Sequence, residues 1–148
     1  MPRIYVAMSC CGKSYYRHHH HGGYDMHVFH RPMRWMWETL KAESNDVIFI
    51  NPFDDFEQLF IENGIEELTL ILPSPEMKAE ILERADHKQT EYDEWPEVYS
   101  EIYDTFWNMV NNTHYPRIYL QPGTYVSDII DDNGDIKEGV EVIVPNKE

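Results

Sequence analysis

The fold is decided close to the N-terminus, where an apolar run leads into a short loop that contains glycine. This stretch reads Arg3-Ile4-Tyr5-Val6-Ala7-Met8-Ser9-Cys10-Cys11-Gly12-Lys13-Ser14. The run from Ile4 to Met8 is typical of a strand that is buried on both faces of a parallel sheet. If Lys13 opens a helix, the loop before it directs backbone N–H groups toward an anion, and the helix dipole adds to the attraction. The stretch therefore predicts a strand, an anion-binding loop and a helix.

The loop resembles half of the phosphate-binding pattern G-x-x-x-x-G-K-[ST]. In that pattern the lysine reaches the terminal phosphates of a nucleotide and the hydroxyl residue holds Mg²⁺. Gly12, Lys13 and Ser14 reproduce the second half, whereas Ala7 stands where the first glycine is expected. Alanine is the mildest replacement, and it costs roughly 1 kcal/mol if the position needs a positive φ. Two interpretations stay open at this point, a nucleotide-binding loop and a plain connection between a strand and a helix.

The composition indicates one acidic domain. The chain has 148 residues, of which 42% are hydrophobic, so it can fill the core of a single domain. Its formal charge of −15 disfavours general nucleic-acid binding and contact with anionic membranes. The two cysteines, Cys10 and Cys11, are adjacent, which suits a reducing cytosol better than a disulfide framework. No apolar run approaches the roughly 18 residues of a membrane span, so we expect a cytoplasmic protein.

Apolar runs and helical patterns alternate along the chain. We expect strands over residues 3–8, 46–51, 68–72, 117–120 and 140–144, and helices over 33–43, 53–62, 74–84, 95–110 and 125–130. The helix at 74 has the clearest start, with Ser74 as N-cap and Pro75 in the first helical position. Residues 17–32 are expected to form the end of a short helix and a loop. The alternation predicts an α/β fold with a mainly parallel sheet of four to five strands and right-handed crossovers.

A series of short motifs follows the first strand in a recognisable order. They are Gly12-Lys13-Ser14, Asp25, Asp46-Val47-Ile48-Phe49-Ile50, Glu62-Asn63-Gly64-Ile65, the helix start Pro73-Ser74-Pro75-Glu76, Trp95, Arg117-Ile118-Tyr119-Leu120 and Gly123-Thr124-Tyr125-Val126-Ser127-Asp128. In this order they resemble small P-loop nucleotide-kinase-like proteins of tailed bacteriophages, over roughly residues 3–130. The resemblance implies a three-layer P-loop NTPase-like fold in a single domain over residues 1–148. It also implies a lid over residues 84–95. Beyond the region of the resemblance, we expect residues 131–148 to form an acidic C-terminal extension.

The same resemblance implies a nucleotide-kinase-like phosphotransferase, which moves the γ-phosphate of ATP to a nucleotide or another small acceptor. Such transfer requires charge neutralisation, a metal holder and a group that positions the acceptor. The residues implied as catalytic are Lys13, Asp25 and Arg84. Those implied to bind ATP are Ser9, Cys10, Cys11, Gly12, Lys13, Ser14, Arg17 and Lys88. Those implied to hold Mg²⁺ are Ser14 and Asp25.

Each of these charged residues also has a purely structural interpretation. Lys13 can be a solvated lysine at a helix start, and Asp25 can be a turn residue. Arg84 and Lys88 can pair with neighbouring glutamates, which so acidic a chain supplies readily. Arg17, one turn beyond the loop, can simply be exposed to solvent.

Two further hypotheses about function remain open. The first is a catalytically degenerate P-loop protein of phage origin that acts by binding alone. Ala7 favours it, and so does Asn51, because a Walker-B strand would end in Asp at that position. The second is a metal-dependent hydrolase with nitrogen and sulfur ligands. Its candidate ligands are His18, His19, His20, His21, His27, His30, Cys10 and Cys11.

Overall fold

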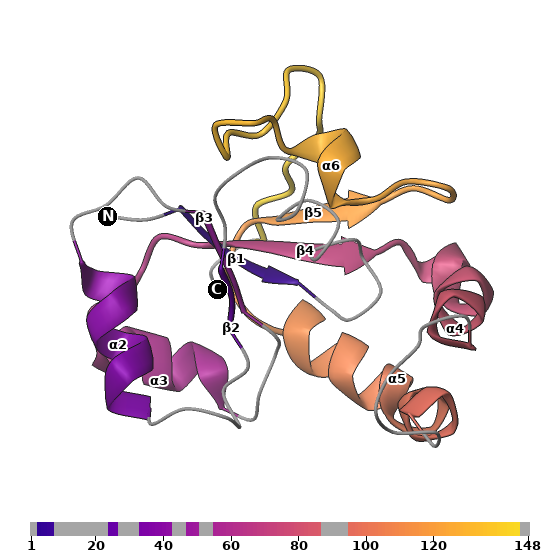
Figure 1. Cartoon of the computed structure of the whole chain (residues 1–148), viewed down its shortest axis with the longest axis horizontal. Coiled ribbons are helices and arrows are strands. Elements are labelled where there is room, and N and C mark those ends of the chain that lie inside the picture. The colour runs from indigo at the N-terminus through magenta and orange to yellow at the C-terminus, as the bar shows by residue number, and fades with distance from the viewer. Residues whose placement is uncertain are drawn as a thin grey trace.

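The computed structural model describes residues 3–7, 24–26, 33–42, 47–50, 55–86 and 95–145. Strands and helices alternate through these ranges (Figure 1). In chain order they are β1 (Arg3–Ala7), β2 (Tyr24–Met26), α2 (Met33–Lys41), β3 (Val47–Ile50), α3 (Phe56–Glu62), β4 (Thr69–Pro73), the 3₁₀ turn η2 (Pro75–Met77), α4 (Lys78–Asp86), α5 (Trp95–Asn111), β5 (Arg117–Leu120) and α6 (Val126–Ile129).

The strands form one five-stranded sheet in the order β2-β3-β1-β4-β5. Every neighbouring pair in it is parallel. In Figure 1, α2, α3 and α5 lie below the sheet, and α6 lies above β5. The predicted α/β class with a parallel sheet is therefore confirmed, and the arrangement is compatible with a three-layer α/β fold. The strand that precedes the candidate loop, β1, lies at the centre of the sheet.

The central strands are buried because both faces of the sheet are covered. All four residues of β3 are buried, and so are the last four residues of β1 and of β4. Such continuous apolar strands suit a parallel sheet that lies between two layers. Below the sheet, α2 and α3 meet through aromatic side chains, with the Trp37 ring edge-on to that of Phe60 at 5.3 Å between centroids. No helix in the described ranges combines the length and the apolar character that crossing a bilayer requires.

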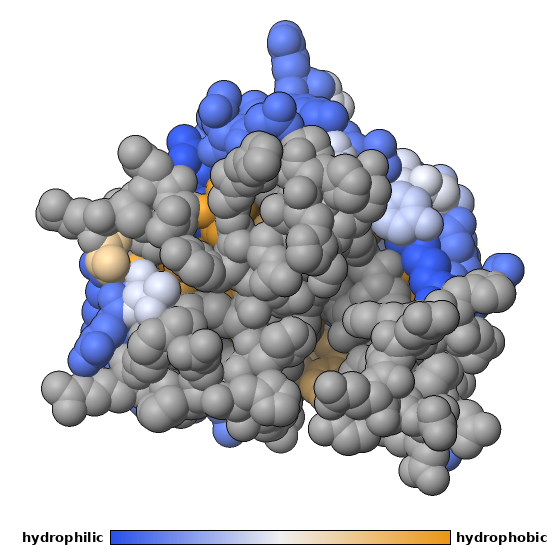
Figure 2. Space-filling model, in the orientation of Figure 1, coloured by the Kyte–Doolittle hydropathy of each residue, from blue (hydrophilic) through white to orange (hydrophobic). Residues whose placement is uncertain are grey.

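The C-terminal segment, residues 130–145, folds back onto the start of the sheet. The Tyr5 hydroxyl donates to the Gly134 carbonyl oxygen at 2.6 Å, and Arg3 Nε lies 2.7 Å from Asp135 Oδ1. Gly134 has φ +83°, and a Cβ there would lie 2.2 Å from Val47 Cγ2. The top of Figure 2 is hydrophilic, whereas Val142, Ile143 and Val144 near the end of this segment are exposed apolar residues. The predicted acidic extension thus has part of its length, residues 131–135, held against β1 and β3.

Two details of the expected elements differ from the structure. Residues 24–26 form the edge strand β2, in register with β3 through Asp25 and Phe49, where the sequence pattern indicated a loop. The expected late strand at 140–144 is reduced, within the described residues, to a single antiparallel bridge between Ile143 and Arg117. Both differences arise at sheet edges, where pairing depends on the neighbouring strand rather than on the local sequence.

Candidate functional site at the carboxyl edge of the sheet

The order of the strands creates a topological switch point between β1 and β4. After β1 the chain continues to β2 at one edge of the sheet, and after β4 it continues to β5 at the opposite edge. The chain therefore leaves these two neighbouring strands in opposite directions. In open α/β sheets, ligands bind outside the carboxyl ends of the strands at such a point. The fold alone thus selects the region beyond Ala7 and Pro73 as the candidate site.

On one side of the switch point, β4 extends beyond the end of β1. Ala7, the last residue of β1, is in register with Ile71. Ser74 follows Ile71 by three residues, so it lies about 10 Å farther along the strand direction. β5 extends with β4, because Leu120 is in register with Pro73. β4 and β5 therefore form a wall beside the space into which the chain leaves β1.

Helix α5 supports this wall from below the sheet. Trp107 on α5 donates its indole N–H to the Pro73 carbonyl oxygen at 2.9 Å, and its ring stacks on that of Tyr119 in β5. About one turn earlier along α5, Asp104 ties the helix to α4, because its Oδ2 lies 2.8 Å from Nζ of Lys78. The wall is therefore held from several directions, which favours a fixed geometry at the end of β4.

At the end of the wall, Ser74 is buried and its hydroxyl oxygen has no hydrogen-bond partner among the described residues. The residue is 3% exposed to solvent. The sequence predicted an N-cap serine here, but the structure shows no hydrogen bond from the side chain to the helix start. Ser74 occupies the predicted N-cap position, before Pro75, but the Met77 N–H bonds to its backbone carbonyl oxygen, at 2.9 Å, rather than to its side chain. A buried hydroxyl without a partner is unusual in a folded protein.

Arg84, predicted to be catalytic, lies on α4 and is held in a local cluster. Its guanidinium pairs with Glu80 at 2.6 Å, donates to the Thr124 carbonyl oxygen at 2.9 Å and lies over the Tyr125 ring at 3.9 Å from the centroid. Glu80 in turn accepts the Gly123 N–H at 3.0 Å. The structural alternative of an ion pair with a neighbouring glutamate is therefore found. In this arrangement Arg84 fastens α4 to the loop after β5.

Asp25, the other described residue predicted to be catalytic, lies in β2. It is in register with Phe49 in β3, which is in register with Tyr5 in β1. Across two strand spacings, the main chain of Asp25 lies about 10 Å from that of Tyr5. The remaining predicted site residues lie outside the described residues, and so do Asn51 and all six histidines proposed as metal ligands. These site residues are Ser9, Cys10, Cys11, Gly12, Lys13, Ser14, Arg17 and Lys88.

No cluster of three or more histidine, cysteine, aspartate or glutamate side chains suited to a metal ion occurs within the described ranges. One described histidine, His114, follows the end of α5. Its Nδ1 lies 3.3 Å from Glu57 Oε1, and its backbone N–H donates to Glu57 Oε2 at 2.6 Å. These contacts join the loop after α5 to α3.

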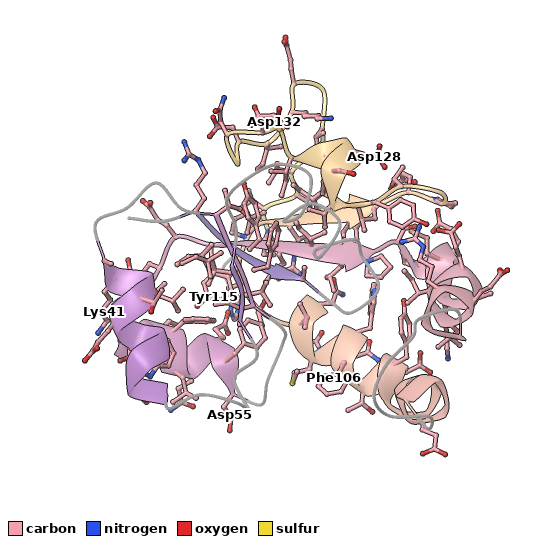
Figure 3. The ribbon with its side chains drawn as sticks, in the orientation of Figure 1. Lys41, Asp55, Phe106, Tyr115, Asp128 and Asp132 are labelled. Carbon is pink, nitrogen blue, oxygen red and sulfur yellow. The ribbon has the colours of Figure 1, made fainter. Side chains whose placement is uncertain are left out.

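Asp128 and Asp132 lie away from α5. Figure 3 shows Asp128 on α6 and Asp132 on the turn after it, on the opposite side of the sheet from Phe106 of α5. Asp128 Oδ2 accepts the Tyr125 N–H at 2.8 Å, which closes the start of α6. Asp128 therefore has a local capping role in this arrangement.

Below the sheet, Tyr115 has a raised pKa. Burial of the ring, together with the nearby carboxylates of Glu57 and Glu66, raises the pKa of Tyr115 to about 12. Its hydroxyl lies 3.4 Å from the Glu57 carbonyl oxygen, and Figure 3 shows its place near α3. The tyrosine is thus neutral over the physiological range and acts as part of the core.

Comparisons of the chain with protein-family models, curated proteins and solved structures found no match. The candidate site therefore depends on the topology and on the residues themselves. Ser74 is the site residue that the sequence did not single out, because a serine before a proline and an acidic residue is typical of a helix cap. Only the hydrogen bonds around Ser74 distinguish a serine whose side chain caps a helix from one whose hydroxyl is left for another partner.

Proposed function

We propose that this chain is a P-loop nucleotide-binding protein, and that it transfers the γ-phosphate of ATP to a nucleotide or another small acceptor. One observation carries the proposal. The strand that leads to Gly12-Lys13-Ser14 is the central strand of an all-parallel sheet and borders its switch point. A glycine-rich loop between a central strand and a helix presents backbone N–H groups where phosphates bind in such folds. The charge of −15 does not oppose this, because one lysine and a few N–H groups suffice for a small ligand.

The proposed chemistry uses few side chains. The acceptor oxygen bonds to the γ-phosphorus of ATP, the bond from that phosphorus to the β–γ bridging oxygen breaks, and ADP leaves. Lys13 would neutralise the terminal phosphates, and Ser14 would hold Mg²⁺. Asp25 would orient the acceptor or bind the metal through water. Mg²⁺ supplies charge neutralisation on the β- and γ-phosphate oxygens when it is bound.

A second candidate function is nucleotide binding without transfer. The observation that favours it is the position of Arg84, whose guanidinium is already engaged by Glu80, Thr124 and Tyr125. A lid arginine that closes over phosphates would have to leave these contacts. In this alternative, the fold keeps the anion site and the segment over residues 84–95 does not act as a catalytic lid.

Binding of Mg²⁺-ATP tests the proposal, with Lys13→Ala as the variant and Lys41→Ala as the control. Lys41 is an exposed lysine in the last turn of α2. A charge-assisted hydrogen bond contributes about 1.5–3 kcal/mol, so Lys13→Ala should weaken binding at least tenfold, as measured by isothermal titration calorimetry. Lys41→Ala should bind like the wild type.

Turnover then separates the two candidate functions. Release of ADP with a panel of nucleoside monophosphates supports the transferase, and tight binding without ADP release with any acceptor supports the binding protein. If millimolar Mg²⁺-ATP neither binds nor raises the melting temperature of the wild type, both are overturned.

A further inference from the structure

The hydroxyl of Ser74 is a buried polar group that forms no hydrogen bond within the described part of the chain. Its oxygen is buried from solvent and has no hydrogen-bond partner among the described residues. Leaving a buried donor or acceptor unpaired costs about 1–3 kcal/mol, so such groups are retained where a ligand or an ordered water completes them. The position of Ser74 at the end of β4 makes this exception informative.

The main-chain groups around the hydroxyl are, by contrast, paired directly. The Ser74 N–H donates to the Leu120 carbonyl oxygen at 2.9 Å, and the Ser74 carbonyl oxygen accepts from the Met77 N–H at 2.9 Å. The Pro73 carbonyl oxygen accepts from the Trp107 indole at 2.9 Å. The backbone at Ser74 is thus fixed by hydrogen bonds on both sides. Within the described part of the chain, its side-chain hydroxyl is left without a partner.

The register places Ser74 beside the switch point. Ser74 lies about 10 Å beyond Ile71, which is level with the last residue of β1. A ligand held in line with β1, just past its end, would therefore lie alongside Ser74. Two independent observations, the strand order and the unpaired hydroxyl, point to the same place.

We infer that Ser74 is a ligand-contacting residue, whose hydroxyl donates a hydrogen bond to a phosphate oxygen of the nucleotide bound at the switch point. The inference rests on the proposed function, because it takes the ligand to be a nucleotide. A phosphate oxygen is the partner we assign because the loop that follows β1, the neighbouring strand, has the sequence of a phosphate-binding loop. Ser74 would hold the phosphate from the β4 side.

The test combines two measurements on Ser74→Ala, the stability of the free protein in urea and the affinity for Mg²⁺-ATP. The hydroxyl has no partner among the residues that the structure describes, so its removal should leave stability unchanged or raise it. Loss of a hydrogen bond to a charged phosphate should weaken Mg²⁺-ATP binding by about tenfold. Thr113→Val is the matched control, because the Thr113 hydroxyl is buried but donates to the Val110 carbonyl oxygen at 2.8 Å. That variant should lose stability and keep its affinity.

Each other outcome overturns the inference in a recognisable way. Loss of stability in Ser74→Ala with unchanged affinity would make Ser74 a structural cap. Unchanged stability together with unchanged affinity would leave water as the partner of the hydroxyl. If the wild type itself does not bind Mg²⁺-ATP, the proposed function fails, and the assignment of Ser74 fails with it.

Discussion

Replacement of Arg117 by methionine should be among the most destabilising single substitutions in this chain. Arg117 begins β5, is 3% exposed and points its guanidinium at the end of α5. Its Nη1 donates to the carbonyl and side-chain oxygens of Asn111, and its Nη2 donates to the carbonyl oxygens of Thr113 at 2.5 Å and Tyr115 at 2.9 Å. The carbonyl groups at the end of a helix favour a positive charge. Arg117 therefore caps α5 and ties it to β5.

The expected loss follows from these contacts. Methionine preserves much of the apolar stem but leaves three backbone carbonyl oxygens without their donor. Breaking a buried charged network in this way costs about 3–5 kcal/mol, which is a large part of the 5–15 kcal/mol that stabilises a typical domain. Urea denaturation followed by circular dichroism measures the free energy of unfolding directly. The slope of that free energy with urea concentration should stay constant if the variant still folds and unfolds in two states.

Arg3→Met is the matched control for this prediction. Arg3 begins β1 as Arg117 begins β5, and it also forms an ion pair, but its side chain is 39% exposed and that of its partner Asp135 is 54% exposed. An exposed pair contributes about 0–1 kcal/mol because water and salt screen it. If Arg117→Met loses no more stability than Arg3→Met, the account of a buried cap on α5 is refuted.

Two further predictions concern stability. Gly134→Ala should cost about 2 kcal/mol or more in thermal unfolding, because the new Cβ would meet Val47 Cγ2 at 2.2 Å in addition to the strain of a positive φ. Gly139→Ala, where φ is +86° and the space is open, should cost about 1 kcal/mol, and equal losses in the two variants would contradict the packing described for Gly134. The pKa of Tyr115 is raised to about 12 in the folded protein, so between pH 10 and 12 the unfolded chain binds fewer protons and stability falls as pH rises. After allowance for solvent screening this loss is on the order of 1 kcal/mol, and an unchanged pH profile of stability in Tyr115→Phe would refute it.

The sequence predicted the strands of the sheet well because their burial is continuous. Residues 4–7, 47–50 and 70–72 are buried and apolar throughout, and such runs can be recognised without knowledge of the partner strands. β2 was missed because three residues carry no periodic pattern, and only the free edge of β3 makes them a strand. Residues 140–144 show the opposite case. They have the composition of a strand, but within the described residues they pair with β5 only at Ile143.

The candidate site could be predicted only in part. The short motif Gly12-Lys13-Ser14 can be read from the chain, but the switch point beside it depends on strand order, which arises from contacts between distant residues. The role of Ser74 was hidden because its sequence context is that of a helix cap, and only the bond from Met77 to the backbone oxygen reveals the difference. The pairing of Arg84 with Glu80 follows from their spacing of four residues on one helix, but its contacts with Thr124 and Tyr125 do not.

The central claim is that a phosphate binds where the chain leaves β1, beside the end of β4. Titration of ¹⁵N-labelled protein with Mg²⁺-ATP, followed by backbone amide chemical shifts, tests it most directly. The account predicts the largest shifts at residues 9–14 and at Ser74, with little change at residues 113–117, which lead into β5. Shifts confined to other residues, or none at saturating nucleotide, would contradict the claim.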